Sequence, residues 1–141
     1  MTPRQRLWLI TALLLVLMAV AFAARKSWSR EQAELTKTAW SRERAEVPVG
    51  MPREQVLGVM ETIAWGHHEC PRESYDGRKY TVDVYFMGSR DIKRAGILIL
   101  HYGDTPTHPL TEKFSVEEYR KESELWSCNP MVFYNLEPFE F

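Results

Sequence analysis

The chain has 141 residues, 45% of them hydrophobic, 26% charged and 12% aromatic, and its formal net charge is −1. This composition is typical of a globular chain and argues against disorder. Residues 47–141 carry ten Lys and Arg against fifteen Asp and Glu, whereas a nucleic-acid-binding domain is expected to be basic. The sequence therefore predicts one small folded domain and no nucleic-acid partner.

The first feature along the chain is an apolar run at residues 7–24, from Leu7 to Ala24, which contains no charge, proline or glycine. At about 1.5 Å per residue a helix of this length spans roughly 27 Å, close to the hydrocarbon thickness of a bilayer. The run therefore predicts a transmembrane anchor, with the lipid bilayer as its partner. Ala21 and Ala23 have the small-x-small spacing of a signal-peptidase site, so a cleaved signal peptide stays open. We favour the uncleaved anchor because a helix-compatible segment follows directly.

The charges on the two sides of the run bear on its orientation. Residues 1–6 form a basic flank with Arg4 and Arg6, while Arg25, Lys26 and Arg30 follow the run. Counted literally, these charges do not favour export of the C-terminal part. The flank nevertheless resembles a secretory n-region, and long C-terminal domains translocate largely regardless of charge. We expect a cytoplasmic N-terminus and an extracytoplasmic domain, and the opposite orientation stays open.

Residues 25–46 are predicted to form a helical stalk. Ser29 with Gln32 fits a capping box, in which the serine oxygen accepts a free backbone N–H at the start of a helix. The apolar stripe of this helix is thin, so we expect it to bury little surface against the domain. Two hypotheses follow: a solvated stalk, or a partner-binding or interfacial helix in which Trp28 and Trp40 are the contact residues.

Residues 47–141 are predicted to form one small α+β domain with helices on one face of an antiparallel sheet. Its first helix opens at Pro52, because proline suits the first helical position, where its missing N–H costs nothing. Gly66 is expected to end this helix. Apolar residues recur at i, i+3, i+4 and i+7, which gives one buried face: Val56, Val59, Met60 and Ile63.

Two strands and a further helix and strand follow. Residues 79–88 alternate with a period of two, which predicts a strand with one buried face. Residues 95–102 are continuously apolar, which predicts a strand covered on both faces, and a polar turn joins the two as a hairpin. A loop covers 103–109, a second capping box at Ser115 starts a helix to about Trp126, and 131–136 read as a last strand. The predicted order in the domain is therefore α-β-β-α-β.

The segment that opens the domain carries a local resemblance to a known family. Gly50-Met51-Pro52-Arg53-Glu54-Gln55-Val56 resembles the helix opening of the small outer-membrane assembly lipoproteins of the SmpA/OmlA type, and a helix followed by strands is similar to their arrangement. The resemblance covers residues 49–60, about a dozen of the 141, and here Pro52 replaces the usual threonine. It implies a non-enzymatic envelope assembly module. The lipidation cysteine and the Leu-Gly exit of the family are absent.

Cys70 and Cys128 are the only cysteines, and each is predicted to lie in a loop. If the domain is exported, they are expected to form a disulfide. A bridge across this separation is worth roughly 4 kcal/mol by the chain-entropy estimate. The alternative is two unrelated thiols in a cytosolic domain.

The string His67-His68-Glu69-Cys70 contains three kinds of metal ligand. His101 and His108 are further candidates, but zinc sites usually take their ligands from two separated pairs. We therefore expect surface-loop residues here and a structural histidine at position 101, with His67, His68 and His101 as the residual metal candidates. No catalytic residue and no cofactor are predicted.

The sequence as a whole predicts a membrane-anchored, non-enzymatic protein-binding module, either an envelope assembly factor or an accessory subunit of a membrane complex. No small-molecule substrate is evident. The alternative is a metal-binding protein or an enzyme that uses the His67, His68 and Cys70 loop.

Overall fold

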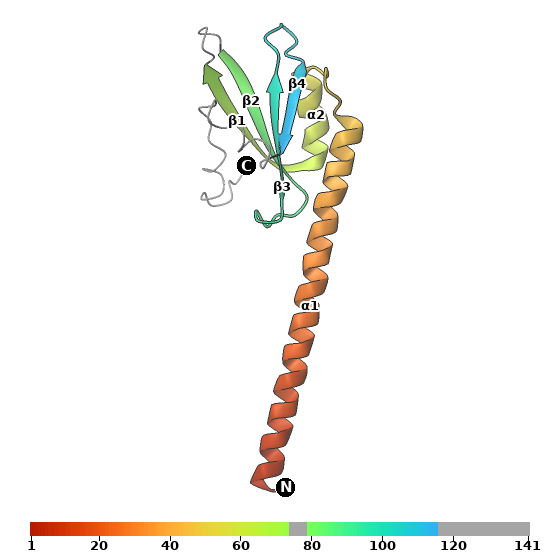
Figure 1. Cartoon of the computed structure of the whole chain (residues 1–141), viewed down its shortest axis with the longest axis vertical. Coiled ribbons are helices and arrows are strands. Elements are labelled where there is room, and N and C mark those ends of the chain that lie inside the picture. Colours follow the sequence, from red (N-terminus) through yellow and green to blue (C-terminus); the bar gives the residue numbers. More distant parts are fainter. Residues whose placement is uncertain (74–78, 116–141) are drawn as a thin grey trace. The chain divides into compact units, whose positions relative to one another are not determined.

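The computed structural model describes the backbone of residues 1–73 and 79–115 and the side chains of residues 1–69 and 81–115. Within these residues the chain divides into two compact units, Met1–Gln32 and the part that begins at Ala33. The elements, shown in Figure 1, are α1 (Pro3–Glu46), α2 (Arg53–Ile63), β1 (Ala64–Glu73), β2 (Lys79–Met87), β3 (Gly96–Tyr102) and β4 (Leu110–Ser115). The predicted α+β class is confirmed.

The helix of the first unit begins with a capping box that was not predicted. The Gln5 N–H donates to Thr2 Oγ1 at 3.3 Å, and the Thr2 N–H donates to Gln5 Oε1 at 2.9 Å. Pro3 takes the first helical position, as expected for a residue without an N–H. The predicted capping box at Ser29 and Gln32 is wrong, because the residues before Ser29 are already helical and leave no free N–H groups to cap.

The apolar run keeps its large side chains exposed. Within the described residues, α1 is the one helix long and apolar enough to cross a membrane, by length and composition. The exposed apolar residues include Trp8, Leu9, Ile10, Leu13, Leu14, Leu15, Val16, Leu17, Val20 and Phe22. A single long apolar helix near the N-terminus is compatible with a single-pass membrane protein.

The second unit is built around a four-stranded antiparallel sheet in the order β1-β2-β3-β4. The predicted hairpin of residues 79–88 and 95–102 is confirmed as β2 and β3, with Val84 opposite Ile99. The predicted α-β-β-α-β order is incomplete, because the structure adds β1 before the hairpin and β4 after it. Neither shows the alternation of apolar and polar residues that made β2 recognisable. The predicted helix after Ser115 and the strand at 131–136 lie outside the described residues, and Ser115 itself ends β4.

The second helix follows its prediction except at its two ends. Pro52 is not its first helical residue but the extended residue just before it, with φ −59° and ψ 143°. Val56 and Met60 are buried, and Val59 and Ile63 pack at the edge of the same cluster. The helix does not run on to Gly66: Ala64 is already extended, with φ −88° and ψ 147°. Gly66 instead lies in β1 beside an irregularity in the pairing with β2. The glycine therefore marks a bulge rather than a helix stop.

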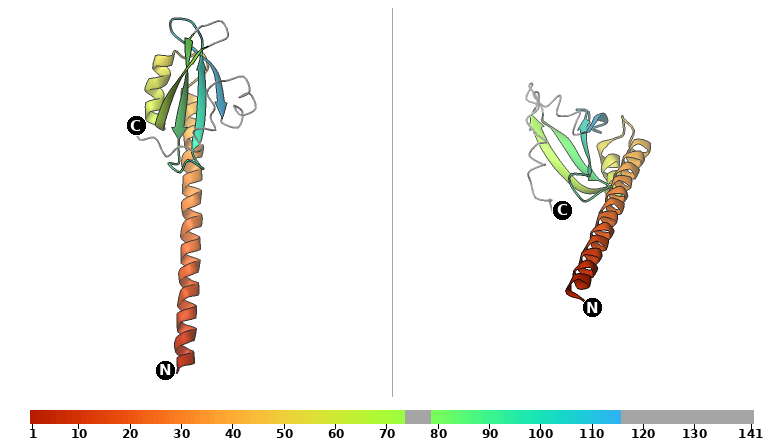
Figure 2. Two further views of the ribbon diagram at one scale, coloured as in Figure 1. Left: turned by 90° about the vertical axis from the view of Figure 1, so that its left-hand side faces the viewer. Right: turned by 60° about the horizontal axis from the view of Figure 1, so that its bottom comes forward.

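The core has two layers, one on each face of the sheet. On one face α2 and residues 33–46 of α1 contribute to a cluster that includes Tyr85, Met87, Leu98 and Leu100, and Figure 2 shows both helical segments on the same side of the sheet. The other face buries Val82, Val84, Phe86, Ile97 and Ile99. Both faces of β2 are thus buried, so the prediction of one buried face is wrong, whereas the prediction for β3 is confirmed.

The C-terminal part of α1 belongs to this unit. Ala39 and Glu43 are buried, and the Thr36 hydroxyl donates to the Arg94 carbonyl at 2.8 Å and accepts from the Ser89 N–H at 3.1 Å. The expectation that this segment buries little surface is wrong. Apart from Trp40, its contacts use small and polar side chains, which leave only a thin apolar stripe in the sequence.

The close approach of α1 to the sheet depends on a glycine. A Cβ on Gly88 would lie 2.3 Å from the Thr36 Cα, and Gly88 has a φ of +73°. Glycine is therefore required at this position by both space and backbone conformation.

Candidate functional site

A buried carboxylate lies between α2 and the sheet. Asp83 stands in the middle of β2, on the face toward the helices, and its side chain is 0% exposed. Arg53, the first residue of α2, donates from Nε to Oδ2 at 2.9 Å and from Nη2 to Oδ1 at 3.0 Å. This bidentate geometry matches the guanidinium fork to the two carboxylate oxygens. The pair therefore satisfies a charge that could not otherwise be buried.

A histidine is a further partner of Asp83. His67 of β1 lies with Nε2 at 2.8 Å from Asp83 Oδ1, and its ring stacks on Tyr85 with centroids 4.5 Å apart and planes 11° apart. An ionised carboxylate only accepts hydrogen bonds, so Nε2 carries the proton. The side chain is 32% exposed.

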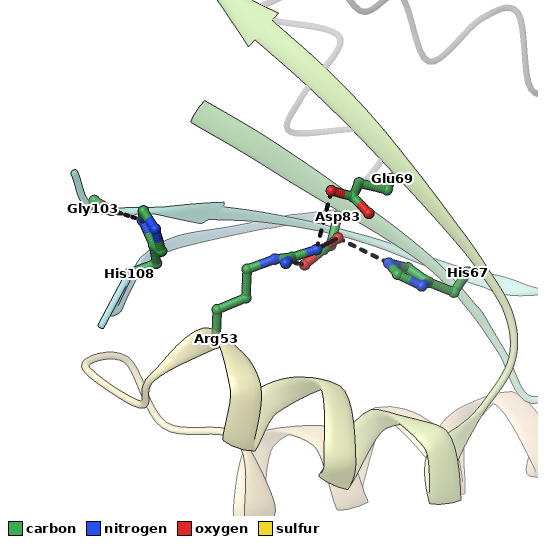
Figure 3. Close-up of polar contacts among 6 residues, drawn as sticks. All are labelled: Arg53, His67, Glu69, Asp83, Gly103 and His108. Atoms are coloured by element: carbon green, nitrogen blue, oxygen red, sulfur yellow. Dashed lines mark hydrogen bonds and ion pairs between the residues drawn. The ribbon is translucent and has the colours of Figure 1, made fainter. Parts of the chain in front are cut away.

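The outer edge of this group is also charged. Glu69, two residues after His67 on the same face of β1, has Oε1 at 3.6 Å from Arg53 Nη2, and its side chain is 55% exposed. The guanidinium also lies 5.7 Å from the centre of the Tyr102 ring, in cation–π range. Figure 3 shows Arg53 reaching from the start of α2 toward the two carboxylates and His67 approaching from β1. We call Arg53, His67, Glu69 and Asp83 the Asp83 cluster.

The electrostatics of the cluster favour its ionised form. Burial opposes ionisation of Asp83, but the hydrogen bonds from His67 and Arg53 outweigh it and hold the pKa of the carboxyl below its ordinary value. The hydrogen bond to Asp83 raises the pKa of Arg53. Burial, together with the charge of Asp83, raises the pKa of Tyr85 and of Tyr102. Both phenols therefore stay neutral around an ion pair.

The loop before β4 holds the start of α2. The Arg53 N–H donates to the His108 carbonyl at 3.1 Å, in a helix whose N-terminus has no side-chain cap. His108 has a φ of +45°, which is unusual outside glycine, and its Nδ1 lies 3.2 Å from the Gly103 carbonyl. Figure 3 shows this contact beside the Asp83 cluster. The loop thus positions Arg53 through its backbone.

The predicted metal candidates are not brought together. His67 and His68 are neighbours on β1, so they point to opposite faces of the sheet, and they lie in a strand rather than in the predicted loop. His101 of β3 is buried edge-on against Phe114, with centroids 5.1 Å apart. Among the side chains that the structure describes, no three His, Cys, Asp or Glu residues are arranged to hold a metal ion.

The remaining predicted residues fall in different parts of the chain. Cys70 lies in β1, where its backbone pairs with Val82, so the prediction of a loop at Cys70 is wrong. Cys128 lies outside the described residues, and the disulfide stays a prediction. Trp28 is 45% exposed. Trp40 packs against the core of the second unit.

Comparison with protein-family models, curated proteins and solved structures finds no match. The resemblance of residues 49–60 to the assembly lipoproteins therefore stays a prediction.

The Asp83 cluster was not predicted from the sequence, although one signal of it is present there. Asp83 interrupts the same face of β2 as Tyr85 and Met87, and a charged residue flanked by apolar neighbours on a buried face needs a partner. Its partners Arg53 and His67 stand 30 and 16 positions away. Finding them requires the pairing of β1 with β2, and the sequence did not predict β1.

Proposed function

We propose that this chain is a single-pass membrane protein that holds a small α+β domain at the membrane surface for binding other proteins. The observation that carries the proposal is the apolar run of α1, whose large side chains are exposed along its whole length. Such a surface is stable in lipid and would be costly in water. The chain then continues into a folded domain with its own core.

The proposal includes an orientation and a role. The N-terminus is cytoplasmic and the domain extracytoplasmic, and the domain acts as an envelope assembly factor or as an accessory subunit of a membrane complex. The local resemblance at residues 49–60 supports the assembly role. The charged, partly exposed edge of the Asp83 cluster supports protein binding, since His67 and Glu69 offer polar groups at the surface.

Orientation is tested with membrane-impermeant maleimide on intact cells that express the full chain. We expect Cys70 and Cys128 to be labelled only after reduction, because export and the disulfide both predict oxidised thiols facing outward. Thiols that label only after the membrane is permeabilised would overturn the orientation. Thiols that label in intact cells without reductant would keep the orientation and overturn the disulfide.

Protein binding is tested by photo-crosslinking in the same membranes. A photoreactive residue replaces Trp28, Val49 or Glu69, which are exposed, and a control carries it at the exposed Arg90. We expect one discrete protein adduct from at least one test position, and loss of that adduct in the His67→Ala chain if the Asp83 cluster takes part. Adducts of lipid alone at every position would overturn the binding function.

The alternative, a metal site or an active site at His67, has one observation in its favour. A histidine oriented by a buried carboxylate is a common arrangement in both kinds of site. The test is the metal content of the purified full chain with and without His67→Ala. Stoichiometric zinc that disappears in the variant would replace the binding-module proposal.

A further inference from the structure

A cluster of positive charge without carboxylate partners follows the apolar run of α1. Arg25, Lys26 and Arg30 lie within six residues that contain no Asp or Glu. All three side chains are exposed, and within the part of the chain that the structure describes none of them forms an ion pair. Three neighbouring cations on one helix attract an anionic partner from outside the chain.

The position of these cations along the helix indicates the kind of partner. At about 1.5 Å per residue, they stand roughly 2 to 9 Å beyond Ala24, the last residue of the apolar run. The headgroup layer on each side of a bilayer is about 5 to 8 Å thick, and Lys and Arg side chains extend toward it along their apolar stems. The cations therefore lie at the depth of lipid phosphates when the run spans the bilayer.

The spacing of two tryptophans indicates the same depth of the helix in the bilayer, independently of the charges. Trp8 is 75% exposed and Trp28 is 45% exposed, and tryptophan is enriched at both membrane–water interfaces. The two residues are twenty positions apart, or about 30 Å along a helix, which equals the typical hydrocarbon thickness. Trp28 thus marks an interface in the middle of the positive cluster.

We propose that Arg25, Lys26 and Arg30, with Trp28, form a binding collar for the headgroups of anionic phospholipids. The guanidinium forks bind phosphate oxygens in bidentate fashion, the ammonium adds a point charge, and the indole fixes the depth of the helix. The collar would set the register of the span in the membrane. The inference rests on the proposed membrane anchor.

The collar is tested by native mass spectrometry of the full chain in mild detergent. The chain is titrated with phosphatidylglycerol and with phosphatidylcholine of the same acyl chains. We expect phosphatidylglycerol to bind at least about fivefold more tightly, since one cation near an anionic lipid surface contributes roughly that factor. The preference should fall to near unity in Arg25→Gln/Lys26→Gln/Arg30→Gln.

A control variant removes the same charge elsewhere. Lys37→Gln/Arg90→Gln/Lys93→Gln changes three exposed cations outside the collar and should keep the preference. Arg25→Lys/Arg30→Lys keeps the charge but loses the bidentate bonds, so it should lower the preference only in part. Equal loss in the control and the collar variant, or full preference in the collar variant, would overturn the collar. Crosslinking of the collar to an acidic protein, without lipid preference, would also overturn it.

The anchor itself is measured separately, by alkaline carbonate extraction of the full chain from pure phosphatidylcholine vesicles. A chain that is extracted overturns the anchor and the collar together. A chain that stays in the vesicles and shows no lipid preference overturns the collar alone.

Discussion

Two stretches of α1 show how one helix can follow different rules along its length. Residues 7–24 expose apolar side chains on all sides, whereas residues 33–46 are mostly polar and bury Ala39 and Glu43 in the domain. The stability of the first stretch depends on the medium around it, whereas that of the second depends on individual side-chain contacts. A hydropathy profile therefore identifies the first stretch and does not identify the second.

The contacts of residues 33–46 are of kinds that leave little trace in a sequence. Lys113 Nζ donates to Glu43 Oε1 at 2.6 Å and to the Val47 carbonyl at 2.7 Å, seventy and sixty-six residues away. Thr36 meets the turn after β2, where only glycine leaves room. A polar residue in a helix usually faces water, so these buried roles become evident only from the fold.

The largest effect on the free energy of unfolding is expected from a substitution that breaks the contact of α1 with the sheet. Gly88→Ala should lower the free energy of unfolding by at least about 3 kcal/mol, because it adds a backbone clash with Thr36 to the strain of a positive φ. Chemical denaturation of the full chain in detergent, followed by tryptophan fluorescence, measures it. Gly50→Ala is the matched control: its φ is +95° with open space around it, so it should cost about 1 kcal/mol. Equal losses would contradict the close contact.

The next largest effect on the free energy of unfolding is expected from removal of the buried charge of α1. Glu43→Ala should cost about 3 kcal/mol, since it leaves Lys113 partly buried without its carboxylate. The same denaturation assay applies to Glu46→Ala, whose ion pair with Arg42 is solvent-exposed and should be worth less than about 1 kcal/mol. A loss at Glu43 no larger than that at Glu46 would place residues 33–46 outside the domain.

A smaller effect on stability is expected from the buried carboxylate of the sheet, and it depends on pH. The pKa of Asp83 is lower in the folded protein than its ordinary value near 4, so its ionised form stabilises the domain fully above about pH 4, and this stability is lost as the pH falls through the folded value. Asp83→Asn should cost about 2 kcal/mol at pH 7 and flatten the loss of stability below pH 4. Glu54→Gln, at an exposed site in α2, should leave the acid dependence unchanged. An unchanged acid dependence in Asp83→Asn would refute the role of the pair.

The smallest effect is expected in the apolar stretch. Leu14→Ala should change the free energy of domain unfolding by less than about 0.5 kcal/mol, because its side chain is exposed within the chain. The same substitution at Leu100, which is fully buried, should cost about 2 to 5 kcal/mol. Denaturation of both variants measures the difference, and a large effect of Leu14→Ala would show that the run takes part in domain stability.

The sequence predicted the elements whose pattern is local. The apolar run, the apolar face of α2 with Val56 and Met60, and the β2–β3 hairpin each follow from spacing within a short window. It did not predict β1, because Gly66 and Pro71 interrupt any alternation and the strand is held by its ladder to β2. The Asp83 cluster was not predicted either, since His67 lies beside Asp83 only through the pairing of β1 with β2.

Hydrogen exchange of the full chain in phosphatidylcholine nanodiscs, over a series of urea concentrations, tests most directly whether the two stretches of α1 differ. We expect the amides of residues 36–43 to open together with those of β3, at the same urea concentration, while the amides of residues 7–24 stay protected by the bilayer. Exchange of residues 36–43 well before β3, or loss of protection at residues 7–24 together with the domain, would contradict this expectation.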